Sequence, residues 1–153
     1  MDLLIQKLTP EQTVPYELLL LADPSKKIVD GYLQRGVCYI ASLPNQAIAG
    51  AFVLLETRPE TIEIVNIAVR EEEQGKGIGK RMLLQAIAIA KQQGAKTIEI
   101  GTGNSSVAQL ELYQKCGFRI VGVELDFFTR HYEETIIENG IHCRDMIRLR
   151  LEV

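Results

Sequence analysis

The stretch from Thr61 to Ile100 constrains the fold more than any other part of the chain. An apolar run, "TIEIVNIAV", leads into "EEEQGKGIGKRM", then into a helical pattern that ends at Gly94, and then into a second apolar run, "TIEI". A strand, a helix and a strand in this order give a parallel pair joined by a right-handed crossover. The sheet therefore contains at least one parallel pair.

The segments before this unit predict antiparallel strands. After a first strand, "LLIQKL", two helices follow, "VPYELLLLA" and "KKIVDGYLQRG", the second capped by Ser25. The strands "VCYIASL", "AIAGAFVLLET" and "TIEIVNIAV" are separated only by "PNQ" and "RPE". Connections this short join antiparallel neighbours. The sheet is therefore mixed, and the fold class is α+β.

The segments after the unit complete the sheet. "GTGNSS" is a predicted loop, "VAQLELYQKCG" a short helix and "FRIVGVEL" a strand. In the last segment Ile147, Leu149 and Leu151 alternate with charged residues, which predicts a half-buried strand preceded by a turn at Asn139-Gly140. The alternation of this last strand would also permit pairing between subunits, as in a homodimer.

Length and composition indicate one domain over residues 1–153 with its own core. The 17 basic and 20 acidic residues give a charge of -3, which argues against a nucleic-acid partner. Neither a leader pattern nor an apolar run of membrane-spanning length is present, so we expect a cytoplasmic protein that does not bind membranes. The three cysteines form no CxxC pair, and no metal site is expected.

The glycine-rich loop predicts a phosphate site. A helix start carries unpaired N–H groups and partial positive charge, and glycines let a phosphate approach them. A loop that merely permits a tight turn is the simpler alternative, although nearby lysines weaken it. The residues in question are Gly75, Gly77 and Gly79, with cationic charge from Lys76, Lys80 and Arg81.

Two familiar phosphate loops fail on spacing. The Walker pattern requires Ser or Thr after Gly79-Lys80, where Arg81 stands. A dinucleotide fingerprint that began at Gly75 and Gly77 would require a third glycine where Lys80 stands. A nucleotide-binding domain is therefore not supported by either motif.

The segment from Ile62 to Gly122 resembles the acyl-CoA site of the GNAT superfamily of N-acetyltransferases. Gln74, Gly77 and Gly79 match its pattern Q/R-x-x-G-x-G/A in register, and "NSSVAQLELYQKCGFRIVG" resembles the second half of that site. The resemblance implies a three-layer fold with helices on both faces of the sheet. It also implies a V-shaped splay between the fourth and fifth strands, which are parallel and hold acetyl-CoA.

The resemblance also assigns residues to the cofactor. The backbone of the strand pairs with the pantetheine arm, the loop wraps the pyrophosphate, and two further residues lie near the pantetheine or its sulfur. These groups are Ile67, Ala68 and Val69; Gln74, Gly75, Lys76, Gly77, Ile78, Gly79 and Lys80; and Asn104 and Tyr113.

Two residues are candidates for proton transfer. Tyr113 matches the tyrosine that hydrogen-bonds the CoA sulfur in many relatives, and we assign it as the general acid, although its spacing from Leu110 and Cys116 would also suit a core aromatic. Glu63 matches a catalytic base and, by strand alternation, should share a face with Val65, Ile67 and Val69. A solvated glutamate is the alternative for Glu63, and Glu99 or a water chain could supply the base instead.

The resemblance therefore implies an enzyme that moves an acetyl group from acetyl-CoA to a primary amine of a small molecule or peptide. Transfer would be by direct attack, without a metal or a covalent enzyme intermediate. The family places its acceptor pocket near "DFFTRHYEE", which holds Phe127, Phe128, Arg130, His131 and Tyr132. The alternative from another class is a non-catalytic sensor that binds acyl-CoA.

Overall fold

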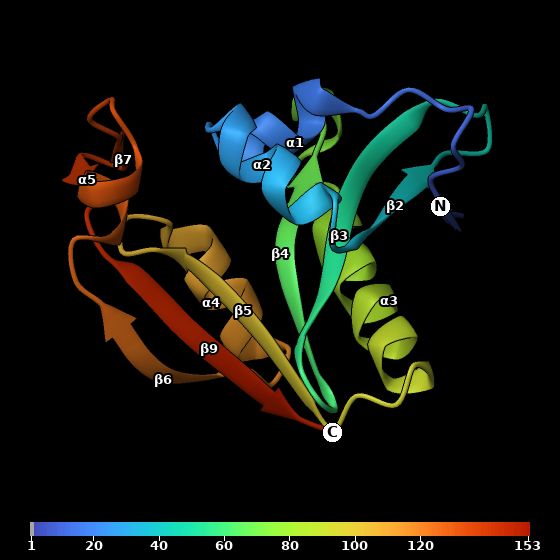
Figure 1. Ribbon diagram of the computed structural model, residues 1–153. Helices are drawn as coiled ribbons and strands as arrows, with labels where there is room; N and C mark the ends of the chain where they lie inside the picture. The colour runs from blue at the N-terminus through green and yellow to red at the C-terminus, as the bar shows by residue number, and fades with distance from the viewer. Residues whose placement is uncertain (1) are drawn as a thin grey trace.

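A mixed sheet forms the centre of the molecule. The computed structural model describes residues 2–153. Its seven-stranded sheet has the order β1-β2-β3-β4-β5-β9-β6, and every neighbouring pair is antiparallel except β4 and β5 (Figure 1). The strands are β1 Leu4–Lys7, β2 Val37–Ser42, β3 Ile48–Arg58, β4 Thr61–Val69, β5 Thr97–Gly103, β6 Arg119–Glu124 and β9 Met146–Glu152.

The four predicted helices are present, and short elements are additional. Ser25 caps α2 as expected, because its Oγ accepts a hydrogen bond from the Ile28 amide at 3.3 Å. Asn139-Gly140 forms the turn of a small separate hairpin, with both residues at positive φ. The remaining elements are α1 Tyr16–Ala22, α2 Lys26–Leu33, η1 Glu71–Glu73, α3 Ile78–Gln92, α4 Val107–Lys115, α5 Phe127–His131, β7 Ile137–Glu138 and β8 Ile141–His142.

Helices cover both faces of the sheet, which confirms the predicted three-layer α+β class. On one face α3 and α4 lie over a core that includes Phe52, Met82 and Ile98. On the other face α1 and α2 cover β2 to β4 with Leu19 and Val29 at the centre. The second face of β5, β9 and β6 has no helix over it (Figure 1).

The fourth and fifth strands part along their length, so the predicted V is confirmed. Parallel pairing runs from Thr61 opposite Thr97 to Ile64 opposite Ile100 and then stops. Beyond that point β4 continues along β3, whereas β5 continues along β9 (Figure 1). The expectation that "GTG" belongs to a loop is wrong, because pairing with β9 extends β5 through Gly103.

A β-bulge changes which way the side chains of β4 point. Leu54 opposes Ile64 and Val53 opposes Asn66, so Val65 is an extra residue. Val65 packs against the α1–α2 core, and Ile67 and Val69 pack against the α3–α4 core. The expected common face for all four residues is therefore wrong, because strict alternation ends at the bulge.

The last strand lies inside the sheet rather than at its edge. β9 pairs with β5 on one side and with β6 on the other. Its apolar alternation is explained by this position, since Leu149 is buried in the α3–α4 core. β9 is therefore not available for the pairing between subunits that the alternation suggested.

Gly50 on β3 provides a test of how closely α3 approaches the sheet. A Cβ at this position would lie 2.6 Å from both the Ala68 carbonyl oxygen and the Met82 Sδ. We expect Gly50→Ala to lower the free energy of unfolding by about 1–3 kcal/mol, because the backbone oxygen cannot move aside.

Urea unfolding measures this loss, and Gly31→Ala is the matched control. Gly31 lies inside α2 with no atom within 4 Å of an added Cβ. The control should gain about 0.5–1 kcal/mol, because alanine favours the helix. Equal stability of the two variants would contradict the close packing of α3 on β3.

Candidate active site

The loop before α3 is held in a conformation that glycine favours. Gly75 and Gly77 have φ values of 80° and 82°, and Gly77 is the N-cap of α3. Gln74 holds the loop against β4, because its Nε2 donates a hydrogen bond to the Val69 carbonyl at 3.0 Å. Lys76 pairs with Glu73 at 3.2 Å, so part of the expected cationic charge is already balanced by the chain itself.

This loop presents a row of unused amides. Within residues 2–153, no backbone amide from Gly75 to Lys80 donates a hydrogen bond to a protein acceptor. A Cβ at Gly79 would meet only Val69, at an ordinary 3.6 Å, so nothing in the chain itself requires glycine there. Free amides at the positive end of a helix, with space above them, fit a diphosphate.

The edge of β4 beside the loop is also open. Ile67, Ala68 and Val69 pair with β3 on one side only, because β5 has already turned away. An extended ligand can add to such an edge as though it were another strand. The segment leads directly into the amide row, so one elongated molecule with an amide-containing arm and a diphosphate could occupy both.

Tyr113 lies on α4, and its ring belongs to the α3–α4 core. The ring is tilted against Phe118 with centroids 6.2 Å apart. Its hydroxyl has no hydrogen-bond partner among the described residues. Within those residues, Asn66 Oδ1 is the only side-chain polar atom that is both fully buried and unpaired, so the unpaired Tyr113 oxygen is not fully buried. The Tyr113 oxygen therefore keeps some access to the surface. Burial raises the pKa of Tyr113, so the phenol stays protonated at neutral pH.

Glu63 lies on β4 in a cluster of charged residues. Its side chain is 21% exposed, and its Oε2 lies 3.5 Å from Arg148 Nη1. Burial raises the pKa of Glu63, while Arg148 lowers it in part. Arg148 is shared, because its Nη2 lies 3.0 Å from Glu124 Oε1. Glu63 therefore combines desolvation with a single long ion pair, which leaves its carboxylate able to accept a proton.

Glu99 is the nearest alternative to Glu63 and is more tightly held. Glu99 Oε2 lies 3.0 Å from Arg58 and 3.2 Å from Arg150. Glu99 therefore contacts two arginines, whereas Glu63 contacts one. Both glutamates line a hollow of about 410 Å³ on the uncovered face of the sheet, together with Thr57, Arg58, Val121, Gly122, Arg148 and Arg150.

Tyr113 and Glu63 lie on opposite faces of the sheet. Tyr113 is in the α3–α4 core, whereas Glu63 is opposite Glu99 among the charges of the other face. A continuous sheet would separate the two groups. The pairing of β4 with β5 ends one residue beyond Glu63, at Ile64 opposite Ile100.

Asn104 has a structural role. Its Oδ1 accepts hydrogen bonds from the amides of Arg144 and Asp145 at 2.8 and 2.9 Å, and its Nδ2 donates to the His142 carbonyl. The side chain therefore joins the end of β5 to the segment before β9. The Oδ1 atom of Asn104 is therefore already occupied by two backbone amides, and the cofactor contact expected for Asn104 stays a prediction.

Asn66 was missed by the sequence analysis. Its side chain is buried, and its Nδ2 donates to the Leu19 carbonyl at 2.9 Å and to the Tyr32 hydroxyl at 2.7 Å. Tyr32 and Tyr132 both donate to Asp23, at 3.4 and 2.8 Å. The signal in the sequence was a single amide within an apolar strand. This hydrogen-bond chain connects β4 to the residue that follows α5.

Five residues were expected near the acceptor. Among the described contacts, only Tyr132 of these five forms a hydrogen bond to the α1–α2 region, where Asp23 accepts it. Phe127 and Phe128 stack edge-on within α5, and Arg148 lies over the Phe127 ring at 5.8 Å. Arg130 and His131 are exposed in the last turn of α5. The structure therefore connects Tyr132 to Asp23 at the end of α1, and it places Phe127 beside Arg148.

Between residues 2 and 153, no group of three or more His, Cys, Asp or Glu is arranged to hold a metal ion. None of the helices in that range is both long and apolar enough to cross a membrane.

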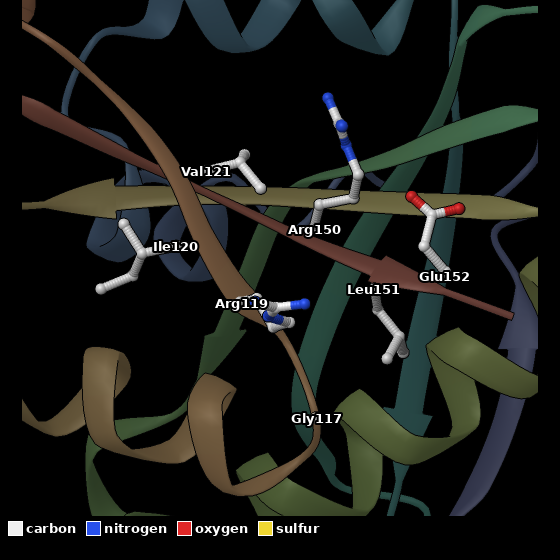
Figure 2. Close-up of a pocket in the computed structure, with 7 residues that line it drawn as sticks. All are labelled: Gly117, Arg119, Ile120, Val121, Arg150, Leu151 and Glu152. Carbon is white, nitrogen blue, oxygen red and sulfur yellow. The ribbon is translucent and has the colours of Figure 1, made fainter.

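A second hollow, of about 490 Å³, lies at the β6–β9 edge and contains none of the candidate residues (Figure 2).

Comparison with known proteins identifies the family. The model of the acetyltransferase (GNAT) family matches residues 4–118. An uncharacterised N-acetyltransferase, YvbK, from Bacillus subtilis strain 168 is 64% identical over 138 residues, which are 90% of this chain and 88% of that protein.

Two solved structures carry the ligand that the site fits. A GNAT family acetyltransferase from Elizabethkingia anophelis with acetyl-CoA bound has a TM-score of 0.96 and 49% identity, covering 99% of this chain and 98% of the other. A Bacillus subtilis acetyltransferase in complex with CoA has a TM-score of 0.92 and 60% identity, covering 99% of each chain.

The parted strands and the amide row define an acyl-CoA-binding protein, whose co-substrate is acetyl-CoA. The chain belongs to the GNAT acetyltransferase family.

The glycine at the N-cap of α3 generates a prediction. Gly77→Ala should cost about 1 kcal/mol in stability, because alanine is strained at positive φ. It should also weaken acetyl-CoA binding, because a methyl group enters the space above the amides. Calorimetric titration with acetyl-CoA measures the second effect.

Gly94→Ala is the matched control for this substitution. Gly94 has a φ of 93° and, like Gly77, no atom within 4 Å of an added Cβ. It lies at the far end of α3, so its strain should be similar while acetyl-CoA affinity is unchanged. If both variants bound acetyl-CoA as tightly as the original chain, the assignment of the amide row would be wrong.

Proposed function

We propose that this protein is an enzyme that transfers the acetyl group of acetyl-CoA directly to a primary amine of a small molecule or peptide. The observations that carry the proposal are Glu63, one residue before the pairing of β4 with β5 ends, and Tyr113, whose ring lies in the core on the other face of the sheet. A proton acceptor and a proton donor then flank one reacting centre. Acetyl-CoA supplies the activated acyl group as a thioester.

The backbone binds most of the co-substrate in this proposal. Gln74, Gly75, Lys76, Gly77, Ile78, Gly79 and Lys80 form the diphosphate site, and Ile67, Ala68 and Val69 form the pantetheine edge. The free amides on that edge also lie where they can stabilise negative charge on the carbonyl oxygen during attack. Asn104 contributes by holding the end of β5 in place.

Glu63 takes the proton from the acceptor. A primary amine with a pKa of about 10.4 is mostly protonated at neutral pH and cannot attack until it loses that proton. The desolvated Glu63 carboxylate has a raised pKa and is therefore a stronger base than an exposed glutamate. Arg148 keeps the carboxylate ionised and oriented before the amine binds.

Tyr113 protonates the leaving thiolate. Its phenol is protonated at neutral pH, and its hydroxyl forms no bond with the described protein groups that would have to break first. The same placement would occur in a sensor that had retained the CoA site without the chemistry. Turnover separates these two functions, since a sensor would release no CoA with any amine.

Tyr113→Phe tests the proposed acid. We expect kcat to fall by about 10²–10⁴-fold, the usual contribution of general acid catalysis, with acetyl-CoA affinity retained. CoA release with a panel of primary amines measures kcat, after the panel has identified an acceptor. Failure of the unmodified protein to turn over any amine would support the sensor.

Tyr39→Phe is the control for loss of a buried hydroxyl. The Tyr39 hydroxyl accepts a hydrogen bond from Gln93 at 3.0 Å in the same core. The control should retain kcat while losing a comparable group. Equal kcat values in Tyr113→Phe and Tyr39→Phe would remove Tyr113 from the mechanism.

The pH dependence of kcat/KM tests the proposed base. Glu63 is active when deprotonated and its pKa is raised, so activity should be lost as pH falls through a value above that of an ordinary glutamate. Arg148→Met should move this limb to higher pH, because Arg148 lowers the pKa of Glu63. Glu99→Gln should move it to lower pH, because the Glu99 carboxylate raises that pKa.

Glu63→Gln completes the series. It should lower kcat by about 10²–10⁴-fold and abolish the acid limb. If the acid limb of the kcat/KM profile stayed at the same pH in all three variants, the base would be another group. Acetyl-CoA-induced stabilisation against heat, measured on each variant, reports that the fold and the co-substrate site are intact.

A further inference from the structure

The edge strand β6 exposes an unusual number of aliphatic side chains. Ile120, Val121 and Val123 are 51%, 50% and 52% exposed, although all three lie within a six-residue strand. The outer side of β6 has no strand partner within residues 2–153, and the strand contains neither proline nor lysine (Figure 1). Soluble proteins usually protect such an edge or pair it, because free strand edges associate.

The register with β9 assigns a face to each residue of β6. Ile120 and Val123 lie opposite Leu149 and Ile147, which pack on the α3–α4 side. Arg119 and Glu124 lie opposite residues of β9 that face the other way, toward the charged cluster. On a regular strand, residues five positions apart point to opposite faces. Arg119 and Glu124 share a face because Val121 is an extra residue at the register shift between Ile120 and Gly122.

Arg119 lacks an anionic partner. It lies opposite Arg150, and like charges directly across two strands are destabilising. Arg150 is itself paired with Glu99, whereas Arg119 is exposed and has no ion pair with any residue that the structure describes. A hollow of about 490 Å³ lies beside Arg119, Ile120 and Val121 along this edge (Figure 2).

We propose that β6 pairs with β6 of a second copy, antiparallel about a two-fold axis between Val121 and Gly122, and so joins two sheets into one. The sequence "RIVGVE" is complementary to itself in this arrangement. Arg119 of each copy lies opposite Glu124 of the other on the charged face. Ile120 lies opposite Val123 on the helical face.

The centre of the interface is also complementary. Val121 of one copy lies opposite Gly122 of the other, and no atom of the chain lies within 4 Å of a Cβ built at Gly122. The branched side chain therefore enters open space. A shift of one residue in either direction would place Arg119 or Glu124 opposite an apolar residue of the other face, so the charges select one register.

Glu124 can accept the second arginine without losing the first. Its side chain is 43% exposed and bonds Arg148 through Oε1 alone among the described groups. Arg119 of the second copy would approach the remaining oxygen. The interface would thus connect to Arg148, the residue that pairs with Glu63.

Light scattering and sedimentation of the full chain at micromolar concentrations test the proposal, and the unmodified protein should be a dimer. Arg119→Glu leaves two acidic residues at the paired positions, and Glu124→Arg leaves two basic ones. Each variant alone should therefore dimerise roughly tenfold or more weakly, because two like-charge contacts replace two ion pairs.

Mixing the two variants is the decisive arm. The Arg119→Glu copy is acidic at both paired positions and the Glu124→Arg copy is basic at both, so one copy of each forms two ion pairs. The mixture should therefore give a one-to-one heterodimer by native mass spectrometry, which also demonstrates that both variants are folded at this edge. A monomeric unmodified protein, single variants that dimerise normally, or a mixture without heterodimer would each overturn the proposal.

Discussion

The structure depends on the early end of one parallel strand pair. β4 and β5 pair over four positions and then take different partners. The parting leaves Ile67 to Val69 with a strand partner on one side only. The bulge at Val65 lies just beyond the point where the two strands part. It directs Asn66 toward α1 and α2 and leaves Ile67 and Val69 on the α3 side.

Three glutamates and three arginines around the site form a network of ion pairs. Arg58 and Arg150 hold Glu99, and Arg148 divides its guanidinium between Glu63 and Glu124. Glu63 is thereby distinguished from its neighbour Glu99, although both come from the same short motif, "TIEI", in their two strands. The difference lies in how many arginines each carboxylate contacts, two for Glu99 and one for Glu63.

The sequence was sufficient for the sheet, its parallel pair and the glycine loop, because periodicity and spacing determine all three. The glycine-rich loop does lead into α3, with Gly75 and Gly77 at positive φ. The bulge was not predictable, since "TIEIVNIAV" gives no sign of it and the extra residue exists only relative to β3. The contacts of Asn104 and Tyr132 were not predictable either, because each joins segments distant in sequence. Asn66 alone left a signal, as one amide in an apolar run.

The hydrogen-bond chain from Asn66 through Tyr32 and Asp23 to Tyr132 has a mechanical consequence. It ties the two arms of the V together at their open end, with burial raising the pKa of Asp23 while its hydroxyl donors lower it. Any movement of the segment after α5 away from α1 must first break the hydrogen bond that the Tyr132 phenol donates to the Asp23 carboxylate. The hydrogen bonds from Asn66 to Leu19 and Tyr32 could stay in place, so β4 would keep its contact with α1 and α2.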